Sequence, residues 1–382
     1  MPWQKVDIMS LRSDFISLAI QPQSNKSELC RRFNISRKTG YKWLRRYYKQ
    51  GFDGLLDQSK RPYNSPECYQ DTELLEAIFY WRRKRNWGGR KIRAVLEGDG
   101  FDPLPSASTI SNILKRKGLI DNSCRQNQSF KRFEWPHCND LWQMDFKGPI
   151  KLRDGKCEPL TVLDDHSRFS LGVVACKDKF GNTVKAHLAD IFRIYGMPWQ
   201  ILADNGNPWG WHRNSMGNSV THVGVWLMSL GIKLIHSRPY HPQTCGKDER
   251  FHRTLKQELV GKEMNCHYNE CQEKFDVWRS EYNTIRPHES LDMTTPSSRY
   301  RVSDRAYPEN VPEPEYGIND IVRSVVQKGR IKFKGTAYRV SEGYSGNRVA
   351  IRPTIKEHIW TVHFYRFKIA ELDIKNAICK KC

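Results

Sequence analysis

The sequence predicts a multidomain α+β protein, because three stretches of the chain carry three different hydrophobic patterns. Apolar residues recur at helical spacing up to about residue 120, strand-like and helical runs alternate over residues 139–284, and short strand-like runs follow from residue 317. A chain of 382 residues is also too long for one hydrophobic core. We expect four parts, at residues 1–62, 63–128, 129–300 and 301–382.

Two short helices are predicted in residues 26–47, which read KSELCRRFNISRKTGYKWLRRY. Leu29 and Phe33 share one face of the first helix, and Ser36 caps the second after a tight turn. The second helix begins with the basic and hydroxyl side chains of Arg37, Lys38, Thr39 and Lys42. This is the helix-turn-helix pattern, whose second helix enters the major groove of DNA. The alternative is an ordinary helical pair with a solvated basic face.

A second helical pair is predicted after a Gly-, Pro- and Ser-rich linker at 51–67. A helix over 71–83 precedes the runs WGGRKIRAVLEGDG and SASTISNILKRKGLI, and Ser106 can cap the last helix. That helix presents Ser108, Thr109, Asn112 and Lys115. We expect a second helix-turn-helix unit, of the winged type, so that two units in series cover a DNA site longer than one helical turn. Residues 121–135 are expected to be a linker.

The middle of the chain predicts a mixed sheet. Three strand-like runs (LWQMDFKG, PLTVLDDHSR and FSLGVVAC) come first, and a helix ending at Gly196 follows them. The run WQILADNG, a helix over 221–230, the run IKLIHS, and helices near 246–262 and 267–284 complete the pattern. The order βββαβαβα is the layout of an RNase H-like α/β domain. From residue 317, short strands with Gly- and Asn-rich turns predict a small β-barrel.

The charge is unevenly distributed along the chain. The net charge is +21 overall, with +12 in residues 1–135, +2 in residues 136–300 and +7 in residues 301–382. This distribution indicates that the domains at the two ends of the chain bind a polyanion. It also indicates that the middle domain carries the acidic residues of a reaction. The alternative is a generally basic protein without such a division.

Cysteine usage and apolar run lengths bear on the cellular compartment. The eleven cysteines are scattered without the spacing of a zinc finger or a disulfide framework. No apolar run approaches the ~18 residues of a membrane span, and no secretory signal is visible at the N-terminus. We therefore expect a cytoplasmic protein that does not enter a membrane.

Three acidic residues stand at positions that favour metal chemistry. Asp145 interrupts an aromatic strand, Asp204 ends the apolar run Ile201–Ala203, and Glu249 lies on the polar face of a helix beside Arg253 and Lys256. Three oxygen ligands on separate elements suit Mg²⁺ or Mn²⁺, and two such ions can drive displacement at phosphorus. Each acid also has a structural explanation when it is taken alone: a strand-edge charge, a turn residue or a first-turn helix acid.

The runs WQMDF, ILADNG and SRPYHPQTCGKDERFHRTLK resemble the three signatures of the retroviral-integrase-type (rve core) DDE transposases of bacterial insertion sequences. The resemblance implies that Asp145, Asp204 and Glu249 are the catalytic and metal-binding triad, with two Mg²⁺ or Mn²⁺ ions per site. It implies cleavage at terminal inverted repeats and strand transfer into target DNA by a homo-oligomer, without a nucleotide cofactor, in bacterial cytoplasm at the nucleoid. It places Asn205 near the metals, and it implies DNA contacts by His241, Gln243, Lys247, Arg250, Arg253 and Lys256.

The chain departs from the common family pattern in two places. Many members have 35 residues between the second and third acids, whereas 44 lie between Asp204 and Glu249, as in one branch with a long insertion. We expect the extra residues in a surface loop, NPWGWHRNSMGNSVTH. Cys245 also stands where the family usually has Asn.

Other acids and other functions compete with this interpretation. Asp164 and Asp165 are interpreted as structural, and Asp248 as a weaker third ligand that points about 100° away from Glu249. One alternative function is a catalytically silent, transposase-derived DNA-binding protein. Another is an RNase H-like nuclease that only hydrolyses its substrate.

Overall fold

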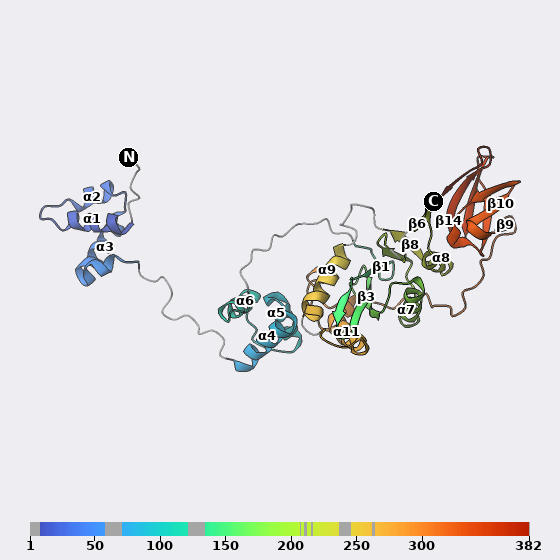
Figure 1. Ribbon diagram of the computed structural model, residues 1–382. Helices are drawn as coiled ribbons and strands as arrows, with labels where there is room; N and C mark the ends of the chain where they lie inside the picture. Colours follow the sequence, from blue (N-terminus) through green and yellow to red (C-terminus); the bar gives the residue numbers. More distant parts are fainter. Residues whose placement is uncertain are drawn as a thin grey trace. The chain divides into compact units, whose positions relative to one another are not determined.

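The computed structural model describes residues 8–57, 71–120, 134–206, 208–209, 212–214, 217–236, 246–261 and 264–381. These residues fall into two compact units, Met1–Gln70 and Asp71–Cys382. Figure 1 shows the helices and strands of each unit with their labels. Within the described ranges, no helix has both the length and the apolar character needed to cross a membrane.

The first unit is a bundle of short helices. Its helices are α1 (Ile8–Ala19), α2 (Lys26–Arg32), α3 (Arg37–Gln50) and the 3₁₀ helix η1 (Gly51–Leu55). Their core is built from Phe15, Ile16, Trp43, Leu44 and Leu55. The side chain of Ser36 accepts a hydrogen bond from Thr39 N at 3.1 Å, so the predicted cap of α3 is confirmed.

The prediction of a linker over residues 51–67 was wrong in its first part. Residues 51–55 form η1, which packs on α3, and Leu55 is completely buried there. Gly51 and Gly54 are typical of a linker, whereas burial of Leu55 comes from contacts with α1 and α3 that leave no local signal in the sequence. The remainder of that segment lies outside the described residues, apart from Leu56 and Asp57.

The second unit begins with three helices. They are α4 (Thr72–Arg85), α5 (Gly89–Gly98) and α6 (Ala107–Arg116). Ser106 accepts a hydrogen bond from Thr109 N at 3.2 Å and caps α6, as predicted. Residues 71–120 contain no strand, so the wing expected of a winged-type unit is not found in that range.

The middle of the second unit is a mixed sheet. Its strands are β1 (Leu141–Phe146), β2 (Ile150–Leu152), β3 (Gly155–Asp164), β4 (Ser170–Cys176), β5 (Gln200–Ala203) and β8 (Lys233–His236). The order is β2-β3-β1-β5-β8, and β4 pairs with β3. Pairs β1–β3 and β3–β4 are antiparallel, whereas β1–β5 and β5–β8 are parallel. The predicted succession of strands and helices along the chain, βββαβαβα, is confirmed, with β2 and two short strands after β5 as additions.

Helices cover both faces of this sheet, as Figure 1 shows for α7 on one side and for α9 and α11 on the other. One layer is α7 (Gly181–Tyr195) and α8 (His222–Ser229). The other is α9 (Gly246–Leu255), the π-helical turn η3 (Lys256–Val260) and α11 (Tyr268–Thr284). Helix α7 ends at Gly196 with φ +69°, where a side chain would also collide with the backbone of Ser303. Short elements η4 (Glu289–Leu291) and α12 (Pro296–Arg299) follow.

The insertion between Asp204 and α8 contains the strands β6 (His212–Asn214) and β7 (Gly217–Ser219). These two strands pair antiparallel with each other. The expectation that the whole insertion is a surface loop was therefore wrong.

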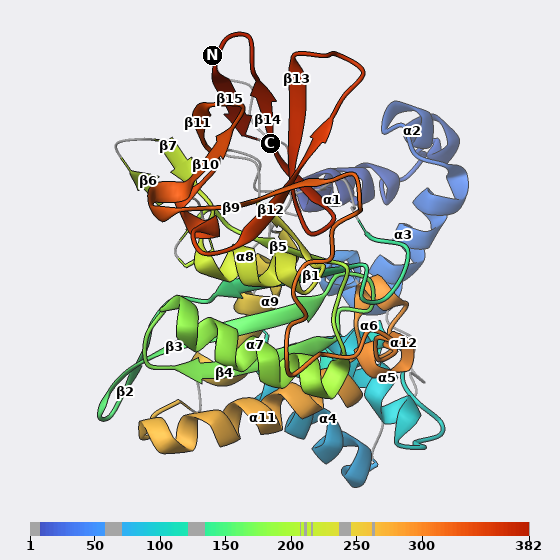
Figure 2. The same ribbon diagram turned by 90° about the vertical axis from the view of Figure 1, so that its right-hand side faces the viewer.

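The C-terminal part is all antiparallel. Its strands are β9 (Ile321–Ser324), β10 (Arg330–Phe333), β11 (Thr336–Arg339), β12 (Arg348–Pro353), β13 (Ile359–Phe364), β14 (Phe367–Asp373) and β15 (Ile378–Lys381). Five of them form the sheet β15-β14-β13-β12-β9, and the hairpin β10–β11 shares its core, together with Tyr344 of the 3₁₀ turn η6 (Glu342–Tyr344). Another 3₁₀ turn, η5 (Gln327–Gly329), precedes β10. Figure 2 shows these strands gathered beyond α8. The contact is close, because Tyr344 Oη donates to Met228 Sδ at 3.4 Å.

Candidate active site

The sheet brings two of the predicted acids to the same edge. Parallel strands β1 and β5 pair Leu141 with Gln200 and Gln143 with Leu202. Asp145 and Asp204 each lie two residues beyond the last of these pairs, at the carboxyl ends of neighbouring strands. Carboxyl ends of parallel strands are where α/β sheets bind ligands.

The electrostatics of Asp145 show that the two carboxyls interact. Burial raises the pKa of Asp145 to about 6, and the charge of Asp204 adds to that increase. A backbone hydrogen bond at Phe146 and the charge of Lys179 oppose it without cancelling it. The pair therefore carries more negative charge than its surroundings neutralise, which favours cation binding.

Asp204 is held by the insertion that follows it. Its Oδ1 accepts hydrogen bonds from Gly206 N at 2.9 Å and from Trp209 Nε1 at 2.6 Å. Trp209 is buried and stacks on Phe146, with ring centroids 5.2 Å apart. Asn205, expected near the metals, is exposed beside Asp204. The insertion thus reaches back into the site, a role that tryptophan in an otherwise polar stretch could have indicated.

Helix α9 presents two acids in opposite environments. Glu249 is exposed, as its place on the polar face predicted, whereas Asp248 is only 3% exposed. Phe251 and Leu255 are buried, as expected from the amphipathic pattern. Asp248 lies three residues before Phe251 and seven before Leu255, so the helical period itself places it on the buried stripe.

The third acid does not complete a preformed metal site. Among the residues that the structure describes, no three His, Cys, Asp or Glu side chains lie close enough together to hold a metal ion. The structure therefore joins Asp145 with Asp204 and places Asp248 near Asp145, while Glu249 stays at the surface.

Asp164 and Asp165 form a buried hydrogen-bond network, in agreement with their structural interpretation. Asp164 accepts from Asn139 N and Ser167 N, both at 2.8 Å. Asp165 accepts from Gln143 Nε2 at 2.6 Å. Lys247 Nζ lies 2.5 Å from Asp165 Oδ1, and burial lowers the pKa of Lys247 to about 8. Lys247, expected to contact DNA, thus ties the start of α9 to the end of β3.

His252 is a site residue that the sequence interpretation missed. Its Nε2 lies 2.8 Å from Thr161 Oγ1, and the Thr161 hydroxyl donates to the carbonyl of Asp145 at 2.9 Å. Nε2 therefore carries the proton, and the lone pair of Nδ1 lies 3.8 Å from Asp145 Oδ2. Burial and the charge of Lys147 lower the pKa of His252 to about 4, so the imidazole is neutral at pH 7. The position of His252 three residues after Glu249, on the same helix, could have indicated that it lies near the site.

The predicted DNA-contacting side chains are accessible with few exceptions. The exposed ones are Arg37, Lys38 and Lys42 on α3, Ser108, Asn112 and Lys115 on α6, and Arg250, Arg253 and Lys256 on α9 and η3. Thr39 and Thr109 are half-buried, because each hydrogen-bonds the serine that caps its helix. His241, Gln243 and Cys245 lie outside the described residues.

A buried cluster of charged and polar side chains joins the end of α4 and the turn after it to η3, the turn that follows α9. Glu258 Oε1 accepts from Trp87 Nε1 at 2.8 Å and from Arg286 Nε at 2.9 Å. Arg85 donates to the carbonyl of Glu258 at 3.0 Å and pairs with Glu281 at 2.7 Å. The helix that carries Glu249 is therefore fixed at its far end to the predicted second DNA-reading unit.

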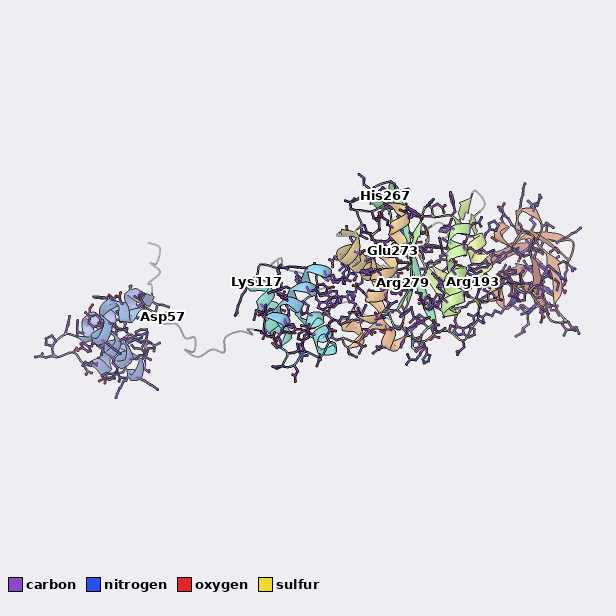
Figure 3. All side chains as sticks on the ribbon, turned by 90° about the horizontal axis from the view of Figure 1, so that it is seen from below. Asp57, Lys117, Arg193, His267, Glu273 and Arg279 are labelled. Carbon is purple, nitrogen blue, oxygen red and sulfur yellow. The ribbon has the colours of Figure 1, made fainter. Side chains whose placement is uncertain are left out.

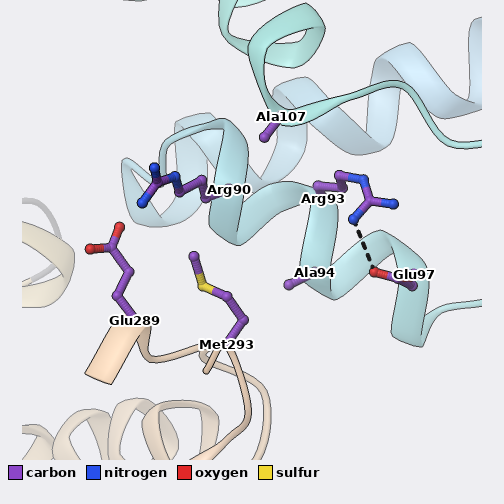
Figure 4. A pocket seen from close by; sticks show the side chains of 7 residues that line it. All are labelled: Arg90, Arg93, Ala94, Glu97, Ala107, Glu289 and Met293. Carbon is purple, nitrogen blue, oxygen red and sulfur yellow. Dashed lines mark hydrogen bonds and ion pairs between the residues drawn. The ribbon is translucent and has the colours of Figure 1, made fainter. Parts of the chain in front are cut away.

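The same junction contains a pocket of about 390 Å³ that does not involve the acids. Figure 4 shows side chains of α5 on one side and those of η4 and the turn after it on the other. It is lined by Arg90, Arg93, Ala94, Glu97, Ala107, Glu289 and Met293. Arg93 and Glu97 pair with each other across one helical turn, at 3.3 Å.

Models of known families match most parts of the chain. Two integrase core domain models match residues 136–242 and 230–296. A helix-turn-helix domain model matches residues 14–63, and a homeodomain-like model matches residues 39–114. The model of the C-terminal domain of IS481 family transposases matches residues 320–379.

Similar proteins include products of bacterial insertion elements. An uncharacterized 31.7 kDa protein of insertion element IS407 from Burkholderia multivorans is 22% identical over 56% of this chain and 75% of its own length. An uncharacterized 39.2 kDa protein of IS476 from Xanthomonas euvesicatoria is 26% identical over 42% of this chain and 43% of its own. The HTLV-2 integrase catalytic core domain in complex with magnesium covers 44% of this chain and 99% of its own, at 18% identity and a TM-score of 0.33.

Proposed function

We infer that this chain, which belongs to the integrase-core transposases of bacterial insertion sequences, frees 3′-hydroxyl ends at its own element and joins them to target DNA. The observation that carries the proposal is the pairing of Asp145 with Asp204 at the carboxyl ends of β1 and β5. The raised pKa of Asp145 supports a role in cation binding, because the charge of Lys179 does not offset burial and the charge of Asp204.

The oxygen donors fit a hard divalent cation. Asp145, Asp204 and Glu249 would hold Mg²⁺ or Mn²⁺, in the proposal two ions. When bound, the ions supply activation of the attacking oxygen and stabilisation of the leaving oxygen at phosphorus. The buried Trp209 fixes the carboxylate of Asp204, and the neutral His252 supports the Asp145 backbone through Thr161.

Basic side chains would place the DNA. Arg253 and Lys256 lie on the exposed side of α9 and η3, next to Glu249 in helical projection, and would hold the phosphodiester backbone against the carboxylates. The exposed residues of α3 and α6 would read the terminal inverted repeat. Two ends would be paired by a homo-oligomer.

The test is strand transfer in vitro with the full chain. The reaction contains Mg²⁺ or Mn²⁺, a labelled oligonucleotide that carries the repeat flanking the gene, and a supercoiled target. Glu249→Gln is compared with Glu273→Gln, a matched control on the exposed side of α11 (Figure 3). We expect joined product from the wild type and Glu273→Gln, and none from Glu249→Gln.

Two other outcomes would replace the proposal. Repeat binding without cleavage or joining would favour a catalytically silent DNA-binding protein derived from a transposase. The exposed position of Glu249 is the observation that keeps this second function open. Cleavage without joining would favour a nuclease.

A further inference from the structure

Trp209 contacts both of the strand ends that carry the paired acids. Its Nε1 donates a hydrogen bond to Asp204 Oδ1 at 2.6 Å, and its ring stacks on Phe146, with centroids 5.2 Å apart and an angle of 8° between the planes. Phe146 is the last residue of β1 and directly follows Asp145. Trp209 itself is only 2% exposed, so packing holds the indole in this position. One side chain thus connects the acid after β5 with the neighbour of the acid in β1.

The two carboxylate oxygens of Asp204 have different surroundings. Oδ1 accepts a second hydrogen bond, from Gly206 N at 2.9 Å, whereas Oδ2 has no donor among the described residues. A Cβ at position 206 would lie 2.8 Å from Oδ2, so the close turn after Asp204 requires glycine. The turn and the indole together hold Oδ1 and leave Oδ2 without a donor.

The ring of Phe146 has further contacts from outside the insertion. Lys179 Nζ lies 5.3 Å from its centroid, and the same ammonium group pairs with Glu158 of β3 at 3.2 Å. Glu158 is buried. The stacking partner of Trp209 is therefore itself held by the sheet, so the stack fixes the indole relative to β1.

The insertion that carries Trp209 is also anchored at its other end. Val220 N donates to Ser341 Oγ at 3.1 Å, and Ser341 is buried in the C-terminal part. A side chain at position 343 would collide with the carbonyl group of Val220, so the two segments approach closely there. Side chains that are locked by packing and by hydrogen bonds keep a fixed geometry, which a positioning role requires.

We propose that Trp209 is a positioning residue of the strand-transfer site: its indole N–H orients Asp204, and its ring fixes the end of β1 that carries Asp145. The proposal rests on the proposed function, which makes these two acids part of the reaction site. It gives the long insertion a role in the reaction. Loss of a side chain that orients a reacting carboxylate slows the reaction by about 10–100-fold, while DNA bound elsewhere on the chain is held as before.

The first experiment separates the two contacts of Trp209. Trp209→Phe keeps an aromatic ring and removes the N–H donor, and Trp209→Leu removes both. Trp199→Phe is the matched control, because Trp199 is 47% exposed and its ring contacts Arg305, 4.3 Å away. The full-length proteins are compared by joining rate at saturating repeat DNA, by repeat affinity and by melting temperature. Joining is measured at a temperature at which each variant is folded.

A positioning role and a structural role predict different results. A positioning role predicts that Trp209→Phe joins about 10–100-fold more slowly with wild-type repeat affinity, that Trp209→Leu joins at least as slowly, and that Trp199→Phe joins as the wild type does. A structural role predicts a lower melting temperature with wild-type joining by the folded protein, and that result would overturn the proposal. Failure of both Trp209 variants to fold would overturn it as well.

The second experiment observes the hydrogen bond without the reaction. In the full chain with ¹⁵N-labelled tryptophan, the indole signal of Trp209 is the one that is missing from Trp209→Phe. We expect Asp204→Asn to shift this signal and to speed its hydrogen exchange, because the carboxylate acceptor is lost, and to leave the signal of Trp199 in place. An unchanged Trp209 signal would show that the indole does not bind Asp204, and the proposal would be wrong.

The two experiments distinguish failure of this proposal from failure of the proposed function. If the wild type joins DNA and Trp209→Phe joins equally fast, only the role of Trp209 is lost. If the wild type joins no DNA although the indole signal responds to Asp204→Asn, the proposed function fails, and the contact between Trp209 and Asp204 is structural.

Discussion

Two buried acids lie ten residues apart on one helical segment, and their surroundings differ completely. Glu258, in η3, accepts from Trp87 and Arg286, and Arg85 donates to its backbone carbonyl. Asp248, in the first turn, has an enclosed oxygen without any such donor among the described residues. Both side chains are less than a tenth exposed. Burial alone therefore does not show how the charge of an acid is balanced.

The difference lies in which charge balances the acid. At Glu258 the chain supplies Arg286, so loss of the carboxylate leaves this buried cation without its ion-pair partner. Asp248 is acted on by the charges of three further acids and of Lys247. Lys247 already pairs with Asp165. Glu258 therefore joins segments that are distant in the sequence, whereas the described residues place no hydrogen-bond donor on Asp248 Oδ1.

The largest expected effect is that of replacing Asp145. Asp145→Asn should lower strand transfer by at least about 10³-fold, because one carboxylate of the pair is lost. Its melting temperature in EDTA should not fall, since the variant removes a repelled charge. The measurement is the joining rate, with Glu273→Gln as the matched control. Joining at the wild-type rate would remove Asp145 from the active site.

The largest expected effect on stability is that of replacing Glu258. Glu258→Gln should lower the free energy of unfolding by about 3–5 kcal/mol, because Arg286 is left buried without its carboxylate. Urea denaturation measures this change, with Asp248→Asn run in parallel. Equal losses in the two variants would end the distinction between the two acids.

The pH dependence of stability gives a smaller effect. The pKa of Asp145 is raised from 3.8 to about 6 in the folded protein, so the folded chain binds this proton more tightly than the unfolded chain. Ionised Asp145 therefore destabilises the metal-free protein increasingly as the pH rises from about 4 through 6. The melting temperature of Asp145→Asn relative to the wild type, in EDTA, should increase from pH 4.5 to pH 7.5. A constant difference would show that Asp145 has an ordinary pKa.

The smallest expected effect concerns α6, which belongs to the predicted second DNA-reading unit. Lys115→Ala on α6 should weaken binding to the terminal repeat by about 3–10-fold and reduce the salt slope by about 1, because one phosphate contact is lost. Fluorescence anisotropy at several salt concentrations measures both quantities. Mn²⁺ affinity should not change, and a change would mean that α6 is coupled to the metal site.

The sequence by itself determined much of the framework. The caps at Ser36 and Ser106 and the amphipathic pattern of Phe251 and Leu255 depend on neighbours within one or two helical turns. The succession of strands and helices along the middle of the chain also follows from the hydrophobic pattern. Local spacing is sufficient for such features because the partners lie close together in the sequence.

Only the tertiary structure decided how the acids are balanced. Lys247 lies opposite Asp165, Trp209 holds Asp204, and Glu258 is neutralised by Arg286. Each of these depends on which segments pack together, and hydrogen-bond donors distant in the sequence leave no periodic signal. The helical period placed Asp248 on the inner face of α9, but only packing showed that its enclosed oxygen meets no donor there.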